Sequence, residues 1–139
     1  MMIAMMSAIA SNAEEGFGTC KIQGTDDYVE GTAYLSLSGS TLSGNLVISN
    51  ASRRPLQSAS ISVSVTYKWK EAHQSPYDGG KVVNNYDNTV SVYSSRWTGN
   101  IAGYQSGQIQ LSKAIRLPQG AYDVAISDIS VTINNPYCK

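Results

Sequence analysis

The chain has 139 residues, and ten Lys and Arg balance ten Asp and Glu, so its formal net charge is zero. That balance argues against a nucleic-acid partner, because binding to phosphates requires a basic surface. The length is typical of one domain with a buried core. Uncharged Ser, Thr, Asn and Gln are abundant, with nine Tyr and 12 Gly, which is typical of a β-protein with an uncharged polar surface.

The N-terminal segment resembles the end of a secretory signal peptide. Residues 2–10 are almost entirely apolar, small residues follow, and Glu14 begins a polar stretch. No Lys or Arg precedes the apolar run, so the signal is either truncated or atypical, and an apolar tail or a short helix is the alternative. The run is too short for a membrane span of ~20 residues, and no later segment qualifies. We therefore expect a leader over residues 1–13 and a single domain over 14–139, in a secreted, periplasmic or cell-surface protein.

Two cysteines, Cys20 and Cys138, stand near the two ends of that domain. Disulfides form in exported proteins, so a bridge between these residues fits the predicted location. The alternatives are a lipid anchor at Cys20 and two unpaired thiols. Two Cys and one His make a poor ligand set for zinc.

Alternation of apolar and polar residues with a period of two predicts strands after the leader. We expect about eight, in chain order over residues 19–24, 31–38, 41–49, 59–70, 81–86, 89–97, 107–117 and 121–133. Gly39 and Ser40 predict a hairpin between the second and third strands. The parity of the apolar positions changes at Ser127 and Asp128, which predicts either a β-bulge or a bend where the last strand changes partners.

The clearest alternation is in residues 60–70, where Ser, Thr and Lys separate the apolar positions. The predicted buried face consists of Ile61, Val63, Val65, Tyr67 and Trp69. Alternation on one face favours a single antiparallel β-sandwich, all-β in class. The hydroxylated face of this strand could instead belong to a sheet edge that recruits another strand, with Lys68 and Lys70 as charges that discourage pairing.

The stretch from Gly44 to Trp69 resembles Ig-like domains of bacterial exported proteins. It has a strand, an Asn-x-Ser turn at Asn50, a Pro-Leu entry and a long alternating strand that ends in an aromatic residue. The small exported domains called FxLYD are similar here, although Val65 to Lys68 stand where those domains have their Phe-x-Leu-Tyr-Asp motif. The resemblance implies an Ig-like sandwich and says nothing about catalysis.

Residues typical of catalysis or metal binding are few in this sequence. His73 is the only histidine, no Ser lies in a Gly-x-Ser-x-Gly elbow, and a solvated loop histidine is the simpler interpretation. We therefore predict that the chain is not an enzyme and needs no cofactor. Asp26, Asp27 and Glu30 are candidates for a calcium site, although they lack the spacing of a known calcium loop.

Tyrosines and amides in predicted loops or at the ends of predicted strands suggest binding instead. Loop Tyr can stack on sugars or anchor a protein at low entropic cost, and amides suit hydroxyl groups. The alternative is that these Tyr cover sheet edges or cap the core. Trp97 departs from the apolar parity of its strand. It therefore lies either outside, as part of an exposed contact patch, or in the core if a bulge precedes it. The predicted binding residues are Tyr77, Asp78, Asn84, Asn85, Tyr86, Trp97 and Tyr104.

These observations predict an exported binding module without catalysis, acting through loop tyrosines or an exposed sheet edge. A carbohydrate-binding module is one alternative, and a subunit of a surface or fibre assembly is another. The expected partner is a protein or a glycan outside the cytoplasm, or a second copy joined edge to edge. Asn50 also begins a glycosylation sequon, which matters only in a eukaryotic source.

Overall fold

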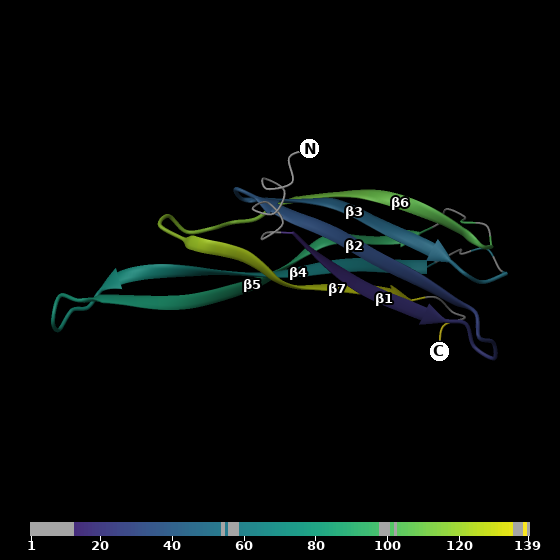
Figure 1. Ribbon diagram of the computed structural model, residues 1–139, viewed down its shortest axis with the longest axis horizontal. Helices are drawn as coiled ribbons and strands as arrows, with labels where there is room; N and C mark the ends of the chain where they lie inside the picture. The colour runs from purple at the N-terminus through teal and green to yellow at the C-terminus, as the bar shows by residue number, and fades with distance from the viewer. Residues whose placement is uncertain are drawn as a thin grey trace, which may run out of the picture.

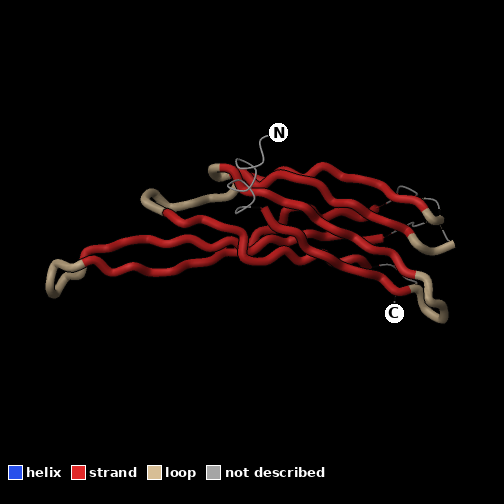
Figure 2. Tube along the Cα trace, in the orientation of Figure 1, coloured by secondary structure: helices blue, strands red, loops and turns tan. Residues whose placement is uncertain are grey.

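A computed structural model describes residues 13–53, 55, 59–97, 101, 103–134 and 138. The described chain consists of antiparallel strands and loops (Figures 1 and 2). The strands are β1 (Ala13–Lys21), β2 (Tyr28–Ser38), β3 (Thr41–Asn50), β4 (Ala59–Gln74), β5 (Lys81–Trp97), β6 (Gln105–Ala114) and β7 (Tyr122–Asn134).

The strands form two sheets with the orders β1-β2-β3-β6 and β5-β4-β7. Their inner faces share one apolar core, as the alternation along each strand predicts. In β4, Ile61, Val63 and Val65 are all buried. The prediction of an all-β protein built as an antiparallel β-sandwich is therefore confirmed.

Two local predictions are confirmed as well. Ser38 pairs with Thr41 at the end of the β2–β3 hairpin. In β7, Asp128 pairs with Thr66 and Ile126 pairs with Tyr67, which leaves Ser127 as the extra residue of a bulge. The Ser127 hydroxyl donates to the Thr66 carbonyl at 3.1 Å, so the bulged residue keeps a hydrogen bond to the neighbouring strand.

Glycines in β1 allow the two sheets to approach closely at one side. A Cβ added to Gly16 would lie 2.5 Å from Ile129 Cγ2, and one added to Gly18 would collide with the Val131 carbonyl oxygen. Real side chains do not tolerate such distances, so β1 can pack on β7 only because these positions lack a Cβ. The sandwich is closed here by backbone contact rather than by large side chains.

The number of strands and some of their limits differ from the prediction. The runs 81–86 and 89–97 form one strand, β5, so the described residues contain seven strands rather than eight. Asp87 and Asn88 do not break the strand because they pair with Lys68 and Tyr67 of β4. The first strand begins at Ala13 rather than residue 19, and β6 ends at Ala114 rather than residue 117. The rest of the predicted leader lies outside the described residues.

The hypothesis that residues 60–66 form a sheet edge is wrong. These residues belong to β4, which is central and pairs with β5 on one side and β7 on the other. The parity change at Ser127 allows β7 to follow the second side of β4 for most of its length. In this sheet the open edges over the described residues are therefore those of β5 and β7.

The predicted disulfide is confirmed. Cys20 and Cys138 are bonded, with their Cα atoms 5.2 Å apart, and an isolated bridge pairs Ile22 with Cys138. The bond joins the end of β1 to the segment that follows β7. Within the described part of the chain, no helix has the length and apolarity needed to span a membrane.

Candidate functional site

The hairpin of β4 and β5 extends beyond the rest of the sandwich as an arm (Figure 1). We define the arm as residues 68–87, which comprise the end of β4, the turn and the start of β5. β4 has 16 residues and β5 has 17, whereas β2 has 11 and β3 has 10, so the four-stranded sheet ends before the hairpin does. The last β7 pairing on β4 is that of Tyr122 with Lys70, and the remainder of the arm is two-stranded.

The inner face of the arm continues the core-facing side of the sheet into solvent. Alternation places Trp69, Glu71 and His73 of β4 on this face, opposite Tyr86, Asn84 and Val82 of β5. The inward-facing side chains of β4 are buried as far as Tyr67 and become progressively more exposed after it. The inner face therefore carries core-like aromatic residues next to polar ones, and the described strands of the other sheet do not extend along the arm (Figure 1).

Three aromatic rings form a continuous stack from the core into the arm. The ring centroids of Tyr67 and Trp69 are 5.6 Å apart at 27°, and those of Trp69 and Tyr86 are 5.7 Å apart at 21°. Tyr67 is buried, and its hydroxyl donates to the Arg116 carbonyl at 3.2 Å and accepts from Asn88 Nδ2 at 3.2 Å. Tyr86 is 37% exposed. The Tyr67 ring is thus held by two hydrogen bonds at its hydroxyl, while the Tyr86 ring is accessible.

Glu71 organises the polar part of the inner face. Its Oε2 accepts a hydrogen bond from Trp69 Nε1 at 2.9 Å, and its Oε1 lies 3.5 Å from His73 Nε2. The Glu71 side chain is 18% exposed and the His73 side chain 50% exposed. His73 belongs to β4 rather than to a loop, which corrects the sequence interpretation. The carboxylate fixes the orientation of the indole and leaves the Asn84 amide opposite it.

The tip of the arm is a compact turn. Asp78 Oδ1 accepts from the Gly80 N–H at 2.9 Å, and the Ser75 hydroxyl accepts from the Tyr77 N–H at 3.2 Å. The Gly80 backbone bond, followed by the Ser75 side chain, lowers the pKa of the Asp78 carboxyl below its usual value. Gly79 has φ of 72°, which an L-residue rarely adopts. Asp78 is therefore a turn residue, whereas Tyr77 is 96% exposed beside it.

The structure brings together only part of the predicted binding set. Tyr77, Asp78, Asn84 and Tyr86 lie on the arm, with Asn84 and Tyr86 inside β5 rather than near the end of a shorter strand. Asn85 is also on the arm but pairs with Lys70, so it belongs to the outer face.

The other two predicted residues lie away from the arm. Trp97 is at the far end of β5, where it pairs with Ala59, and its side chain lies outside the description. Tyr104 precedes β6, and its N–H donates to the Ser52 carbonyl at 3.2 Å. Figure 1 places the start of β6 at the end of the sandwich opposite the arm tip.

The sequence interpretation missed Trp69 and Glu71 as members of a site. The parity of Trp69 predicts a core position, but the side chain is only partly buried, since burial along the inward positions of β4 decreases after Tyr67. A signal was present in the sequence: the same parity continues after Trp69 with Glu71 and His73. Polar residues at inward positions indicate that a strand has left the core.

The calcium candidates do not form a cluster. Asp26 and Asp27 lie in the β1–β2 loop, where the Asp27 N–H donates to Thr25 Oγ1 at 3.0 Å, and Glu30 lies in β2. Among the described residues, no group of three or more His, Cys, Asp or Glu side chains is placed to hold a metal ion. We therefore base no metal site on this loop.

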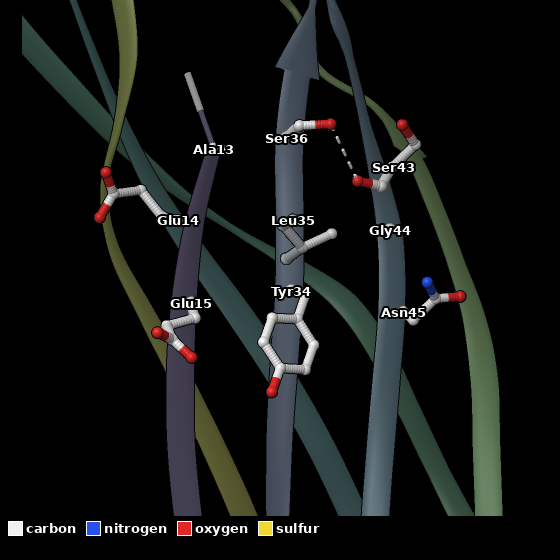
Figure 3. Close-up of a pocket in the computed structure, with 9 residues that line it drawn as sticks. All are labelled: Ala13, Glu14, Glu15, Tyr34, Leu35, Ser36, Ser43, Gly44 and Asn45. Carbon is white, nitrogen blue, oxygen red and sulfur yellow. Dashed lines mark hydrogen bonds between the residues drawn. The ribbon is translucent and has the colours of Figure 1, made fainter. Parts of the chain in front are cut away.

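A shallow depression of about 480 Å³ lies where β1 begins, next to β2 and β3 (Figure 3). Glu15, Tyr34 and Asn45 form one register row across its outer face, and the Ser36 hydroxyl donates to the Ser43 carbonyl at 3.5 Å. The depression is open, and its side chains do not converge on a common point (Figure 3). It is a weaker candidate than the arm, which combines stacked rings with polar groups fixed by hydrogen bonds.

No family model matches this chain, and no curated protein sequence matches it. The resemblance to Ig-like and FxLYD domains stays a prediction.

Proposed function

We propose that this chain is a small binding module without catalytic activity, which holds a hydroxyl-rich ligand such as a saccharide on the inner face of the arm. The observation that carries the proposal is the stacked pair of Trp69 and Tyr86 on a strand face that the described strands of the other sheet leave uncovered (Figure 1). The polar groups of Glu71, His73 and Asn84 adjoin this pair.

Stacking and hydrogen bonding favour a saccharide among small ligands. One face of a pyranose ring is lined by C–H groups, which pack on aromatic rings, and its edge carries hydroxyls. Binding sites commonly combine an aromatic surface with a few oriented polar groups. On the arm, Trp69 and Tyr86 supply the surface. At its edge the Asn84 amide can donate or accept a hydrogen bond, and the Glu71 carboxylate can accept one.

The arrangement favours binding over hydrolysis. Glycoside hydrolysis uses two carboxylates flanking the scissile bond, ~5 to 9.5 Å apart. Glu71 is the one carboxylate on the inner face of the arm, and its oxygens already engage Trp69 and His73. Such a carboxylate positions other side chains and has no second acid as partner.

Location outside the cytoplasm and an Ig-like type of sandwich belong to the same proposal. The Cys20–Cys138 disulfide supports the location, because such bonds persist in oxidising compartments. The resemblance of the segment from Gly44 to Trp69 supports the Ig-like type. Small exported sandwiches of this kind commonly bind ligands through their loops or strand faces.

The test is a glycan array, followed by titration of the best-bound soluble oligosaccharide into ¹⁵N-labelled protein. The chain has two Trp, so a Trp97→Phe variant assigns the remaining indole N–H signal to Trp69. We expect that signal to shift on titration. Tyr86→Ala should weaken binding at least about tenfold, which corresponds to ~1.4 kcal/mol of lost contact energy.

Tyr104→Ala is the matched control, because Tyr104 is also exposed but lies away from the arm. It should leave the dissociation constant unchanged. Trp69→Phe retains a ring and should weaken binding less than Tyr86→Ala, without unfolding the protein. Absence of binding across the array, or binding that Tyr86→Ala leaves intact, would overturn the proposal.

A further inference from the structure

The strand β5 presents an open edge along the arm. In the sheet order β5-β4-β7, the described residues place a hydrogen-bonded neighbour on one side of β5 only. Residues 81–87 lie where the hairpin extends beyond the four-stranded sheet (Figure 1). The backbone N–H and C=O groups of these residues that point away from β4 are therefore accessible to another strand.

The closing bond of the hairpin shows which backbone groups point outward. The Ser75 N–H donates to the Gly80 carbonyl at 2.6 Å, so these residues form a bonded pair. Bonded and non-bonded pairs alternate along an antiparallel ladder, which makes the next pair, Gln74 with Lys81, a non-bonded one. The residues whose N–H and C=O groups point away from β4 are Lys81, Val83, Asn85 and Asp87.

Little along this edge discourages pairing with another strand. Native edges are commonly protected by Pro, by charges or by a bulge. Between Val82 and Tyr86 there is no Pro and no charge, and the irregularity of β5 lies farther along, at Val92. Val82 and Val83 are 44% and 49% exposed.

We propose that two copies of this chain pair through the β5 edges of their arms, antiparallel, about a two-fold axis at Asn84. In this register the outward backbone groups of Lys81 meet those of Asp87 of the second copy. Val83 likewise meets Asn85 of the second copy.

The charges of the side chains, and the sheet faces on which they lie, favour this register over registers shifted along the strand. Lys81 and Asp87 both lie on the outer face of the arm, and the symmetry places a Lys opposite an Asp at both ends of the junction. Val82 and Tyr86 both lie on the inner face and cover each other there. The pairing ends before the bulge at Val92, where the edge is no longer regular.

The symmetry has a consequence for ligand binding. A two-fold axis perpendicular to the joined sheet places both inner faces on the same side. The Trp69 and Tyr86 rings of the two copies then line one continuous surface, and a long ligand can contact both copies at once. Pairing itself does not depend on a ligand, so it can be tested separately from the proposed function.

Sedimentation velocity of the full chain, without saccharide, tests the pairing. The junction is small compared with a stable interface of ~1,600 Å², so we expect a monomer–dimer equilibrium that depends on protein concentration. Val83→Pro removes an outward N–H but no bond to β4, and it should raise the dimer dissociation constant at least about tenfold. Asp87→Lys should do the same, and the double exchange Lys81→Asp with Asp87→Lys should restore dimerisation.

Cross-linking gives an independent measurement. In this register the Asn84 side chains of the two copies are adjacent, in a non-bonded pair whose Cα distance of ~4.5 Å suits a disulfide. Asn84→Cys should oxidise to a covalent dimer, whereas Ser112→Cys on the β6 edge should not. The proposal is wrong if the chain stays monomeric at every concentration and Asn84→Cys fails to cross-link. It is also wrong if a dimer forms that Val83→Pro and Asp87→Lys leave unchanged.

Discussion

Asn50 carries its amide into the protein interior at the end of β3, where it is 1% exposed. Its Nδ2 donates to the Ile101 carbonyl at 3.2 Å, and its Oδ1 accepts from the Ser52 N–H at 3.0 Å. The side chain thereby links the end of β3 to the segment that leads into β6. Because the Asn50 side chain is buried, a glycan on this nitrogen does not fit the folded structure, and the sequon residue is a structural element of the fold.

Replacement of Asn50 should therefore affect stability strongly. Asn50→Ala leaves the Ile101 carbonyl and the Ser52 N–H without this partner in a buried site, which costs ~1–3 kcal/mol for each such group. We expect a decrease of at least about 2 kcal/mol in the free energy of unfolding, measured by urea denaturation. Ser49→Ala, the preceding residue on the opposite face, should change it by less than ~0.5 kcal/mol. Equal effects of the two variants would contradict the structural role of Asn50.

At the scale of single elements, much of the strand pattern could be predicted from local alternation. The parity of residues 61–67 gave the buried face of β4, and the parity change at Ser127 gave the bulge in β7. Asp87 and Asn88 misled the prediction because both residues favour turns in isolation. Pairing with Lys68 and Tyr67 of β4 outweighs that local preference, and such pairing is a non-local property.

The candidate site was predicted only in part, for a related reason. Exposed residues such as Tyr77 and Tyr86 were recognised because tyrosine beside amides is a local signal. The sequence predicts a core position for Trp69 because alternation shows which face a residue shares, but not where the opposite sheet ends. The length of the four-stranded sheet relative to β4 decides that, and it depends on how β2, β3 and β6 pair.

The turn at the tip of the arm should respond to acid. The pKa of Asp78 is lowered because its carboxylate accepts the Gly80 and Ser75 hydrogen bonds. A lowered folded-state pKa means that this contribution is complete above the usual Asp pKa of ~3.9 and is lost as the pH falls through the folded-state value. We expect the Gly80 amide proton signal to move toward its random-coil position over that range, below about pH 4.

Asp78→Asn is the matched control for this titration. The amide oxygen of Asn can still accept the Gly80 bond but does not titrate, so the Gly80 signal should stay constant with pH in this variant. A Gly80 signal that moves equally in both proteins would assign the acid response to another group.

At the scale of the whole molecule, stability is expected to be uneven. The sandwich is closed by the approach of Gly16 and Gly18 to β7 and by the Cys20–Cys138 disulfide. The two-stranded part of the arm lies beyond both of these and beyond the covering sheet (Figure 1). A segment with few buried apolar contacts opens at low free energy, so the arm can adapt to a ligand or to a second copy while the sandwich stays folded.

Removal of the disulfide should therefore destabilise the sandwich more than it alters the arm. The bond spans 118 positions, and the chain-entropy estimate for a loop of that length is ~4–5 kcal/mol at most. The double variant Cys20→Ala with Cys138→Ala should lower the free energy of unfolding by a large part of that value in urea denaturation. While the protein remains folded, the Trp69 indole N–H signal should keep its position, because its bond to Glu71 lies within the arm. A loss below ~1 kcal/mol in the free energy of unfolding would contradict a large contribution of the disulfide to the sandwich. A shift of the Trp69 signal as large as that caused by Glu71→Ala would show that the disulfide also affects the arm.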